Sequence, residues 1–211
     1  MYTNKPQPAR LRSTMILIFV TILGSPMPVQ AGTAPFSLGA PPGSLDSTFG
    51  AYGLVTTSFE IDDDEARDVI IQPDGGIIVA GYSRMYARHR FALVRYDDDG
   101  SVDWQITTDF GSSNAHGRAV ALQPDGKIVV AGYIDLDGEN AEIALARYNA
   151  NGSLDTSFGS DGKVITDLGS GYDTAQDIAI QPDGKIIVVG HKHIGINDND
   201  IALLRYNSDG S

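Results

Sequence analysis

The stretch IAIQPDGKIIVVG at residues 178–190 decides the fold. Two apolar runs flank Pro182, Asp183 and Gly184, where proline presets φ at the first corner of a turn and glycine accepts the positive φ that closes it. This arrangement predicts a β-hairpin. Both runs are apolar at successive positions instead of alternate ones, and we therefore expect strands that are covered by protein on both faces.

This hairpin belongs to a unit that recurs along the chain. The tetrad Gln-Pro-Asp-Gly starts at Gln72, Gln123 and Gln181. The dipeptide Arg-Tyr follows each tetrad and starts at Arg95, Arg147 and Arg205. A third marker, Gly-Ser-(Leu/Val)-Asp, has start-to-start distances of 57, 52 and 58 residues and starts at Gly43, Gly100, Gly152 and, in part, Gly210. Three markers in one order indicate copies of one structural repeat.

Each copy predicts four short strands. The first strand alternates with a period of two residues, as Val55, Thr57 and Phe59 show. The first strand of the three copies is predicted at 54–59, 105–110 and 163–168, and the second ends in the apolar runs 69–71, 120–122 and 178–180. The third strand is predicted at 77–81, 128–132 and 186–190, and the fourth at 91–96, 143–148 and 201–206. A four-stranded antiparallel sheet with a covered middle is a propeller blade. We predict an all-β, β-propeller-like array of such blades, with a stacked β-solenoid as the alternative.

The first part of the chain predicts export. Residues 1–31 combine Lys5, Arg10 and Arg12 with an apolar run of eleven residues at 14–24 and small residues before Gly32, which is typical of a secretory signal peptide. Eleven residues are too few for a bilayer span, which needs about 20. A retained membrane anchor is the alternative. We expect a secreted protein (extracellular, cell-surface or periplasmic) with no transmembrane span after cleavage.

The remaining segments follow the markers. Residues 32–42 are predicted to be a linker, and the repeats to be blades at 43–99, 100–151 and 152–209, with 210–211 starting a fourth copy. Three blades do not close a ring, which usually takes about 4–8. We therefore expect the outward faces of the first and last blades to be exposed to water. The propeller is predicted to be incomplete, as a fragment of a longer chain or as half of a six-bladed dimer.

Composition excludes several function classes. The net charge is −12, and removal of residues 1–31 leaves 12 basic and 27 acidic side chains, a net −15, over 180 residues. Such a surface disfavours nucleic acid as a partner. The chain has no Cys, which excludes disulfides, thiolate metal sites and Cys nucleophiles.

The third copy carries a family resemblance. Its Phe158-Gly159 turn, the Asp161–Val164 segment, the tetrad at Gln181 and the Arg205-Tyr206-Asn207 run resemble the delta-60 repeat of large secreted bacterial proteins. The resemblance covers residues 43–211 and implies a propeller-like array of blades in an exported protein. It implies no catalytic residues. The second copy departs from the pattern, because Asp103 runs directly into Trp104 without a Phe-Gly turn.

Acidic turns are the candidates for binding a cation. Residues 97–103 and 149–155 place oxygen-bearing side chains at positions 1, 3, 5 and 7, and 135–140 is a third such run. Ca²⁺ takes 6–8 oxygen ligands in loops of this kind. Asp, Asn, Gly and Ser are also the residues that strand-linking turns need. We favour the turn interpretation and predict no cofactor, with Ca²⁺ as the alternative.

Three further groups of residues recur or cluster. Arg95, Arg147 and Arg205 are expected to form blade-to-blade ion pairs with Asp46, Asp103 or Asp155, with a ring of anion-binding arginines as the alternative. His191 and His193 could supply two of the ligands of a metal site, but we favour a solvated strand end. His89 and His116 are also expected to be solvated. Aromatic residues also recur at strand ends: Tyr82, Tyr133 and His191 end the third strands, and Tyr96, Tyr148 and Tyr206 end the fourth. We favour packing of these rings, with ligand binding at a rim as the alternative.

These observations favour a non-enzymatic role. We predict a binding or structural display module at or outside the bacterial envelope, with a protein or carbohydrate ligand and no catalytic residue. The alternatives are a propeller-based lyase or hydrolase with its site at the central channel and a calcium-stabilised scaffold of a larger surface protein. His191 and His193 are the one charged cluster that breaks the repeat symmetry, as a reaction centre would.

Overall fold

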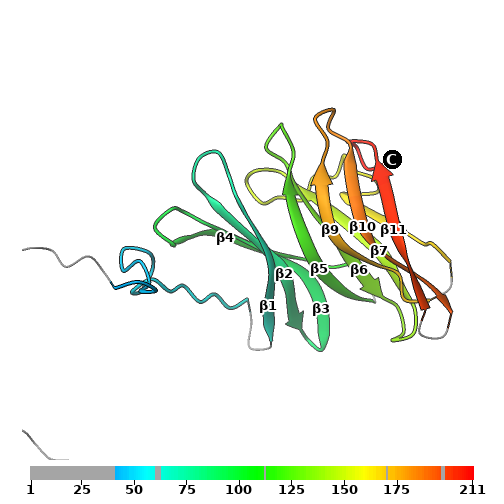
Figure 1. Cartoon of the computed structure of the whole chain (residues 1–211), viewed down its shortest axis with the longest axis horizontal. Helices are drawn as coiled ribbons and strands as arrows, with labels where there is room; N and C mark the ends of the chain where they lie inside the picture. Colours follow the sequence, from blue (N-terminus) through cyan, green and yellow to red (C-terminus); the bar gives the residue numbers. More distant parts are fainter. Residues whose placement is uncertain (1–40, 60–62, 112, 170, 196–197) are drawn as a thin grey trace, which may run out of the picture. The chain divides into compact units, whose positions relative to one another are not determined.

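Three antiparallel sheets follow one another along the chain (Figure 1). The computed structural model describes residues 41–59, 63–111, 113–169, 171–195 and 198–211, which hold eleven strands and no helix. The first sheet consists of β1 (Asp64–Ile71), β2 (Ile77–Met85), β3 (Arg88–Tyr96) and β4 (Val102–Thr108). The second consists of β5 (Asn114–Leu122), β6 (Ile128–Asp135), β7 (Ala141–Tyr148) and β8 (Lys163–Thr166). The third consists of β9 (Thr174–Ile180), β10 (Ile186–Gly195) and β11 (Asp198–Tyr206).

The all-β prediction is therefore confirmed. The predicted signal peptide (1–31) and the linker (32–42), except its last two residues, lie outside the described residues. Residues Gly43–Ser211 form one unit, separate from Met1–Pro42. Within the described residues there is no helix with the length and apolar character needed to cross a membrane.

The Gln-Pro-Asp-Gly tetrads form the predicted hairpin turns. The amide of Gly184 donates to the carbonyl of Gln181 at 2.8 Å, and Gly126 and Gly75 make the same bond to Gln123 and Gln72 at 2.9 and 3.0 Å. The three glycines have φ of +83°, +83° and +89°, in the left-handed region that favours glycine. Each tetrad thus joins the first two strands of a sheet.

The sheets are offset from the sequence repeats. The strand predicted to open the second copy, 105–110, is β4, which pairs with β3 of the first sheet. In the same way β8 pairs with β7. The Gly-Ser-(Leu/Val)-Asp marker therefore connects the third strand of a sheet to its fourth, instead of separating one blade from the next.

The predicted strand at 54–59 is wrong. Only Leu54 makes a β-bridge, to Gly50, and residues 55–59 belong to no strand. The physical reason lies in the offset. Its counterparts β4 and β8 pair with the strand that precedes them, and no described strand precedes residue 54.

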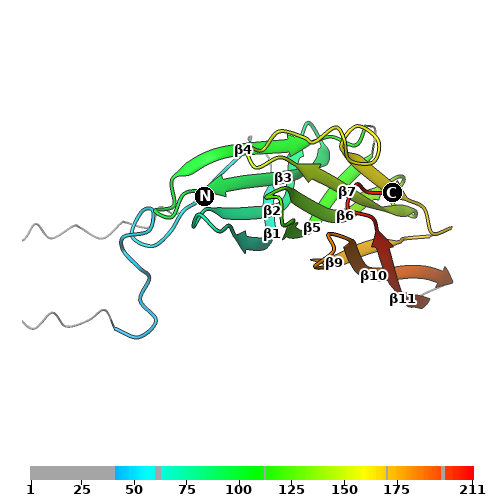
Figure 2. The same ribbon diagram turned by 90° about the horizontal axis from the view of Figure 1, so that it is seen from above.

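Packing between sheets produces two apolar cores. Strand β5 lies across β1, β2 and β3, and β9 lies across β5, β6 and β7. Figure 2 shows the second sheet between the other two. The first core includes Ile78, Phe91 and Leu93 with Val130 and Tyr148, and the second includes Val129, Ile143 and Leu145 with Ile186 and Val188. Only the second sheet is therefore covered on both faces.

Burial along the strands follows from this order. The first seven of the eight residues of β6 are buried, as its unbroken apolar run predicts. Strands β1 and β11 alternate instead, and Val69, Ile71, Ile201 and Leu203 are exposed. The expectation that the outward faces of the first and last blades are in contact with water is confirmed.

A repeated tyrosine–threonine bond joins successive sheets. The hydroxyl of Tyr148 on β7 donates to Oγ1 of Thr108 on β4 at 2.7 Å. Tyr206 and Thr166 lie 2.8 Å apart in the same relation, and Tyr96 donates to Thr57 at 2.8 Å. Tyr148 is fully buried, and burial raises its pKa far above the ordinary value of 10.0. The tyrosine of each Arg-Tyr marker thus has a structural role, because its hydroxyl bonds to a threonine that precedes it in the chain.

Removal of one partner of this bond is expected to destabilise the chain. Tyr148→Phe leaves the Thr108 hydroxyl buried without its partner, and the free energy of unfolding should fall by about 1–3 kcal/mol in urea denaturation. Thr108→Val should cost a similar amount. The double variant should cost less than the sum of the two, and strict additivity would contradict a direct bond. Tyr52→Phe, at an exposed position, is the control.

Candidate binding surface

In each of the first two sheets, the three sequence markers meet at one end of the sheet. Arg95 donates through Nε to Gln72 Oε1 at 2.8 Å and through Nη1 to Asp103 at 2.7 Å. Arg147 donates through Nε to Asp155 at 2.8 Å and through Nη1 to Gln123 at 3.4 Å. One glutamine, one arginine and one aspartate, each from a different marker, therefore form one polar cluster.

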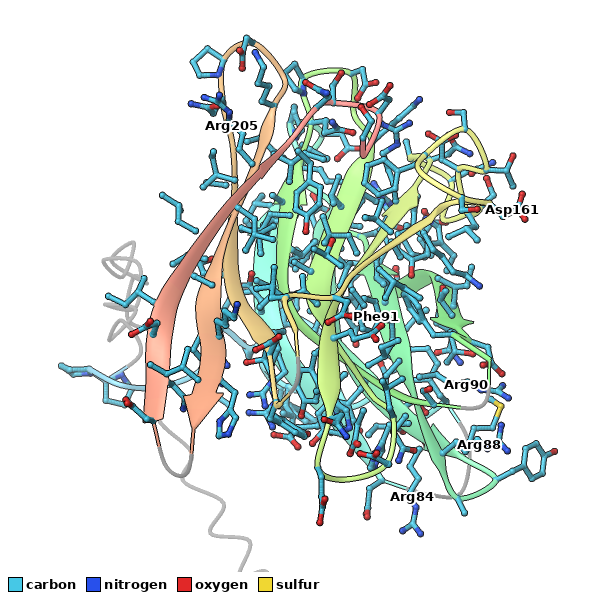
Figure 3. All side chains as sticks on the ribbon, turned by 90° about the vertical axis from the view of Figure 1, so that its right-hand side faces the viewer. Arg84, Arg88, Arg90, Phe91, Asp161 and Arg205 are labelled. Carbon is cyan, nitrogen blue, oxygen red and sulfur yellow. The ribbon has the colours of Figure 1, made fainter. Side chains whose placement is uncertain are left out.

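These contacts confirm Asp103 and Asp155 as the predicted partners of Arg95 and Arg147, but they correct the prediction that the pairs join two blades. Arg95 pairs with Asp103 and Arg147 with Asp155 within one sheet, because the marker that holds the aspartate leads into the fourth strand of that same sheet. Neither arginine pairs with Asp46. Arg205 has no ion pair among the described residues and projects from the outer side of β11 (Figure 3). The arrangement is structural and does not form a ring of free arginines.

The Arg147 cluster also bridges two sheets. Its Nη1 donates to the carbonyl of Ser208, which follows β11, and its guanidinium lies 4.6 Å from the ring centre of Phe158. Lys127 Nζ lies 2.9 Å from Asp155. Burial opposes ionisation of Asp155, but hydrogen bonds from Ser157 and Lys127 and the charge of Arg147 outweigh it and hold its pKa well below 3.8. This cluster is therefore ionised and fixed.

Asp155 and Asp103 occupy equivalent positions but differ in burial, and together they test whether the buried cluster stabilises the fold. The side chain of Asp155 is 9% exposed, whereas that of Asp103 is 46% exposed. Asp155→Ala leaves Arg147 buried without its carboxylate, and we expect it to cost about 3–5 kcal/mol of stability. Asp103→Ala should cost less than about 1 kcal/mol. Equal costs in chemical denaturation would contradict the structural role given to the buried cluster.

The acidic turns bond mainly to their own backbone. Asp99 Oδ1 accepts from the amide of Ser101 at 2.8 Å, and Asn151 Oδ1 accepts from Ser153 at 3.1 Å. Asp137 accepts from the amides of Glu139 and Asn140 at 2.9 and 2.8 Å. These contacts are the ones by which short polar side chains stabilise turns. Within the described residues, no three His, Asp or Glu side chains cluster in a way that would hold a metal ion.

At the opposite ends of the strands lies a row of aromatic rings. Tyr82 on β2 lies 4.7 Å from His116 on β5, and His116 stacks on Tyr133 of β6 at 4.8 Å with an angle of 13° between the rings. His89 lies 4.5 Å from His116, and Tyr172 lies 5.5 Å from Tyr133. We call these five residues the aromatic row. It runs from the first sheet to the second without a break.

Two arginines flank the row at equivalent positions. Arg67 lies 5.5 Å from the ring centre of Tyr82, and Arg118 lies 5.3 Å from that of Tyr133. Each guanidinium also lies 3.4 Å from the hydroxyl of its tyrosine. Glu65 accepts a hydrogen bond from Tyr82 and pairs with Arg67 at 2.7 Å. The same cation–aromatic unit is therefore built twice.

A β-bulge positions each arginine. The ladder between β1 and β2 shifts register between Ala66 and Asp68, which leaves Arg67 without a partner residue, and the shift between Gly117 and Ala119 does the same for Arg118. Bulges redirect side chains in this way. Glycine is required opposite each bulge, because a Cβ on Gly81 would lie 1.9 Å from the Glu65 carbonyl oxygen. The Gly-Tyr dipeptides at 81–82 and 132–133 thus belong to the site.

The sequence predicted only part of this surface. Tyr82 and Tyr133 were expected at a rim, and the structure places both in the row. His89 and His116, which were expected to be solvated, are partly buried against each other. Arg67, Arg118, Glu65 and Tyr172 were missed. A signal was present, because each arginine lies five residues before its Gln-Pro-Asp-Gly tetrad.

Comparison with known families agrees with the geometry. Residues 72–103, 123–158 and 181–211 each match the family described as "Domain of unknown function (DUF5122) beta-propeller". These matches support a chain of β-propeller-like repeats. Each match starts at the glutamine of a tetrad and runs through the Arg-Tyr marker; the first match ends in β4, and the second ends at Phe158, before β8. No curated protein matches the chain.

The third β-propeller repeat departs from the first two at this surface. Gln176 and His191 stand where the earlier repeats have arginine and tyrosine. His191 Nε2 lies 3.1 Å from Thr174 Oγ1, and His193 Nδ1 lies 3.2 Å from Asn199 Oδ1. The two imidazoles therefore contact different neighbours, and the arginine–tyrosine units of the aromatic row belong to the first two repeats.

The row makes the stability of these repeats depend on pH. Burial, and then the charges of His89 and Arg118, lower the pKa of His116 from 6.5 to about 4. Between these values the unfolded chain binds more protons than the folded one, so stability falls as the pH decreases from about 6.5 to about 4. His116→Gln should flatten this part of the profile in thermal melts. A variant profile parallel to that of the wild type would contradict the assignment.

Proposed function

We propose that this chain is a secreted, non-enzymatic binding module that acts at or outside the bacterial envelope. The observation that carries the proposal is the aromatic row with its two arginines. The five rings and the two cation–aromatic units are contiguous, and four of the rings, Tyr82, His89, His116 and Tyr172, are partly exposed beside the buried Tyr133. Such a surface has the means to bind an extended ligand along the blades.

The chemistry of the row favours a carbohydrate that carries carboxylates. Aromatic rings offer flat apolar faces to sugar rings, while their polar edges remain hydrated. Guanidinium groups bind carboxylates through paired donors. Arg67 is exposed, and Arg118 is partly exposed, with a buried Nε that has no hydrogen-bond partner in the described part of the chain. An acidic peptide is the alternative ligand and would use the same groups.

Export is supported by the sequence. The pattern of residues 1–31 is that of a signal peptide, and the mature chain would be strongly acidic. The resemblance to the delta-60 repeat of secreted bacterial proteins points the same way. Stability without disulfides then depends on packing between the sheets.

Affinity electrophoresis tests the binding function. We expect native gels that contain polygalacturonate, a carboxylated polymer, to retard the protein more than gels that contain neutral dextran. Tyr82→Ala combined with Arg118→Ala should weaken the retardation roughly tenfold, about 1.4 kcal/mol of binding free energy.

The matched control is Tyr86→Ala combined with Arg84→Ala, which removes an exposed tyrosine and an exposed arginine from the β2–β3 hairpin outside the row (Figure 3 labels Arg84). This control should bind as the wild type does. The proposal fails if neither polymer retards the protein or if the control loses as much retardation as the variant.

A further inference from the structure

The outward face of the third sheet exposes residues that are buried in the other sheets. Ile201 and Leu203 on β11 are 87% and 71% exposed. Their equivalents, four and two residues before the Arg-Tyr arginine, are fully buried in the first two sheets: Phe91, Leu93, Ile143 and Leu145. In those sheets the next sheet covers them.

The outward face of the first sheet shows the complementary pattern. Val69 and Ile71 on β1 are 55% and 64% exposed. The residues equivalent to Val69, which lie three positions before a tetrad, are Val120 and Ile178, at 4% and 8% exposed. They are covered because the preceding sheet packs on them. The two exposed faces of the molecule are thus the two halves of an interface that it already forms twice.

Residues 54–59 have the sequence of a fourth strand but no sheet. Val55, Thr57 and Phe59 align with Ile106, Thr108 and Phe110 of β4 and the residues after it. Thr57 already bonds to Tyr96, just as Thr108 bonds to Tyr148. The segment therefore lies against the first sheet as the outer strand of a preceding sheet would.

The third sheet has the reciprocal feature. Its order is β11-β10-β9, and β11 pairs only with β10 among the described residues. In the other sheets the equivalent edges, those of β3 and β7, pair with β4 and β8. An unpaired edge beside an exposed apolar face is a template for another strand.

We propose that a second copy of this chain docks head to tail on the third sheet. Residues 54–57 of the second copy pair antiparallel with β11 as its fourth strand, and the first sheet of that copy covers Ile201 and Leu203. The contact is heterologous, because different surfaces of the two copies meet. Two copies that close on each other would form a ring of six sheets, within the usual range of about 4–8.

The internal repeats fix the register of this contact. Thr108 pairs with Phe91 and Ile106 with Leu93, while Thr166 pairs with Ile143 and Val164 with Leu145. Both ladders place Thr57 opposite Ile201 and Val55 opposite Leu203. Between them, Thr56 lies opposite Ala202, as Thr107 lies opposite Ala92 and Ile165 opposite Ala144. Phe59 is then next to Ile201, in the relation of Phe110 to Phe91, whose rings are 4.8 Å apart.

Disulfide trapping between two variants tests the contact. The chain has no Cys, so a full-length Thr56→Cys variant mixed with a differently tagged Ala202→Cys variant contains only the engineered thiols. Directly opposed residues in a ladder lie within the Cα separation that a disulfide allows. Oxidation should give a covalent heterodimer that carries both tags. A mixture of Thr56→Cys with Asp198→Cys, at the far end of β11, should give at least tenfold less.

Association is measured on the same full-length protein by sedimentation at increasing concentration. The wild type should shift from monomer to dimer or larger species, and Leu203→Asp should remain a monomer. Ile165→Asp, at a 48% exposed position on β8, is the matched control and should associate normally. A wild type that stays monomeric at every concentration, or equal trapping by the two cysteine mixtures, would overturn the proposal.

Discussion

Each sheet depends on burial of its apolar faces by the next sheet. The hairpin strands carry Ile, Val and Leu at successive positions, and removal of such side chains from water is the largest favourable contribution to folding. A single sheet of this sequence would leave both of its apolar faces in water. The second sheet avoids this because β5 packs on the first sheet and β9 packs on the second. Hydrophobic burial alone does not fix how one sheet is oriented on the next. The tyrosine–threonine bonds and the Arg147 cluster fix that orientation, because they join specific atoms of successive sheets.

The sequence predicted the hairpins well because their signals are local. Pro-Asp-Gly needs no tertiary partner to form a turn, and the strands that flank it begin and end where the apolar runs do, as Ile71 and Ile77 show. Which strands belong to the same sheet could not be predicted from local sequence. Whether residues 102–108 pair with the strand before them or the strand after them depends on which edge is free, and the marker spacing is the same in both cases. The strand predicted at 54–59 was wrong for this reason.

The candidate surface divides in the same way. Tyr82 and Tyr133 end apolar runs at fixed distances from a tetrad, so their repetition was visible in the sequence. The roles of Arg67 and Arg118 depend on bulges, which arise from pairing register and from the close approach of backbone that Gly81 and Gly132 permit. The contact between His89 and His116 joins two sheets. Neither the spacing nor the composition of one repeat contains that information.

Amide hydrogen exchange of the dilute monomer tests most directly whether burial between sheets holds the fold together. Strands β6 and β7 lie in the sheet that is covered on both faces, whereas β1 and β11 each have one exposed face. The account predicts that amides of β6 and β7 exchange only through global unfolding and that those of β1 and β11 exchange through smaller openings. Equal protection of all four strands, or greater protection of β1 and β11, would contradict it.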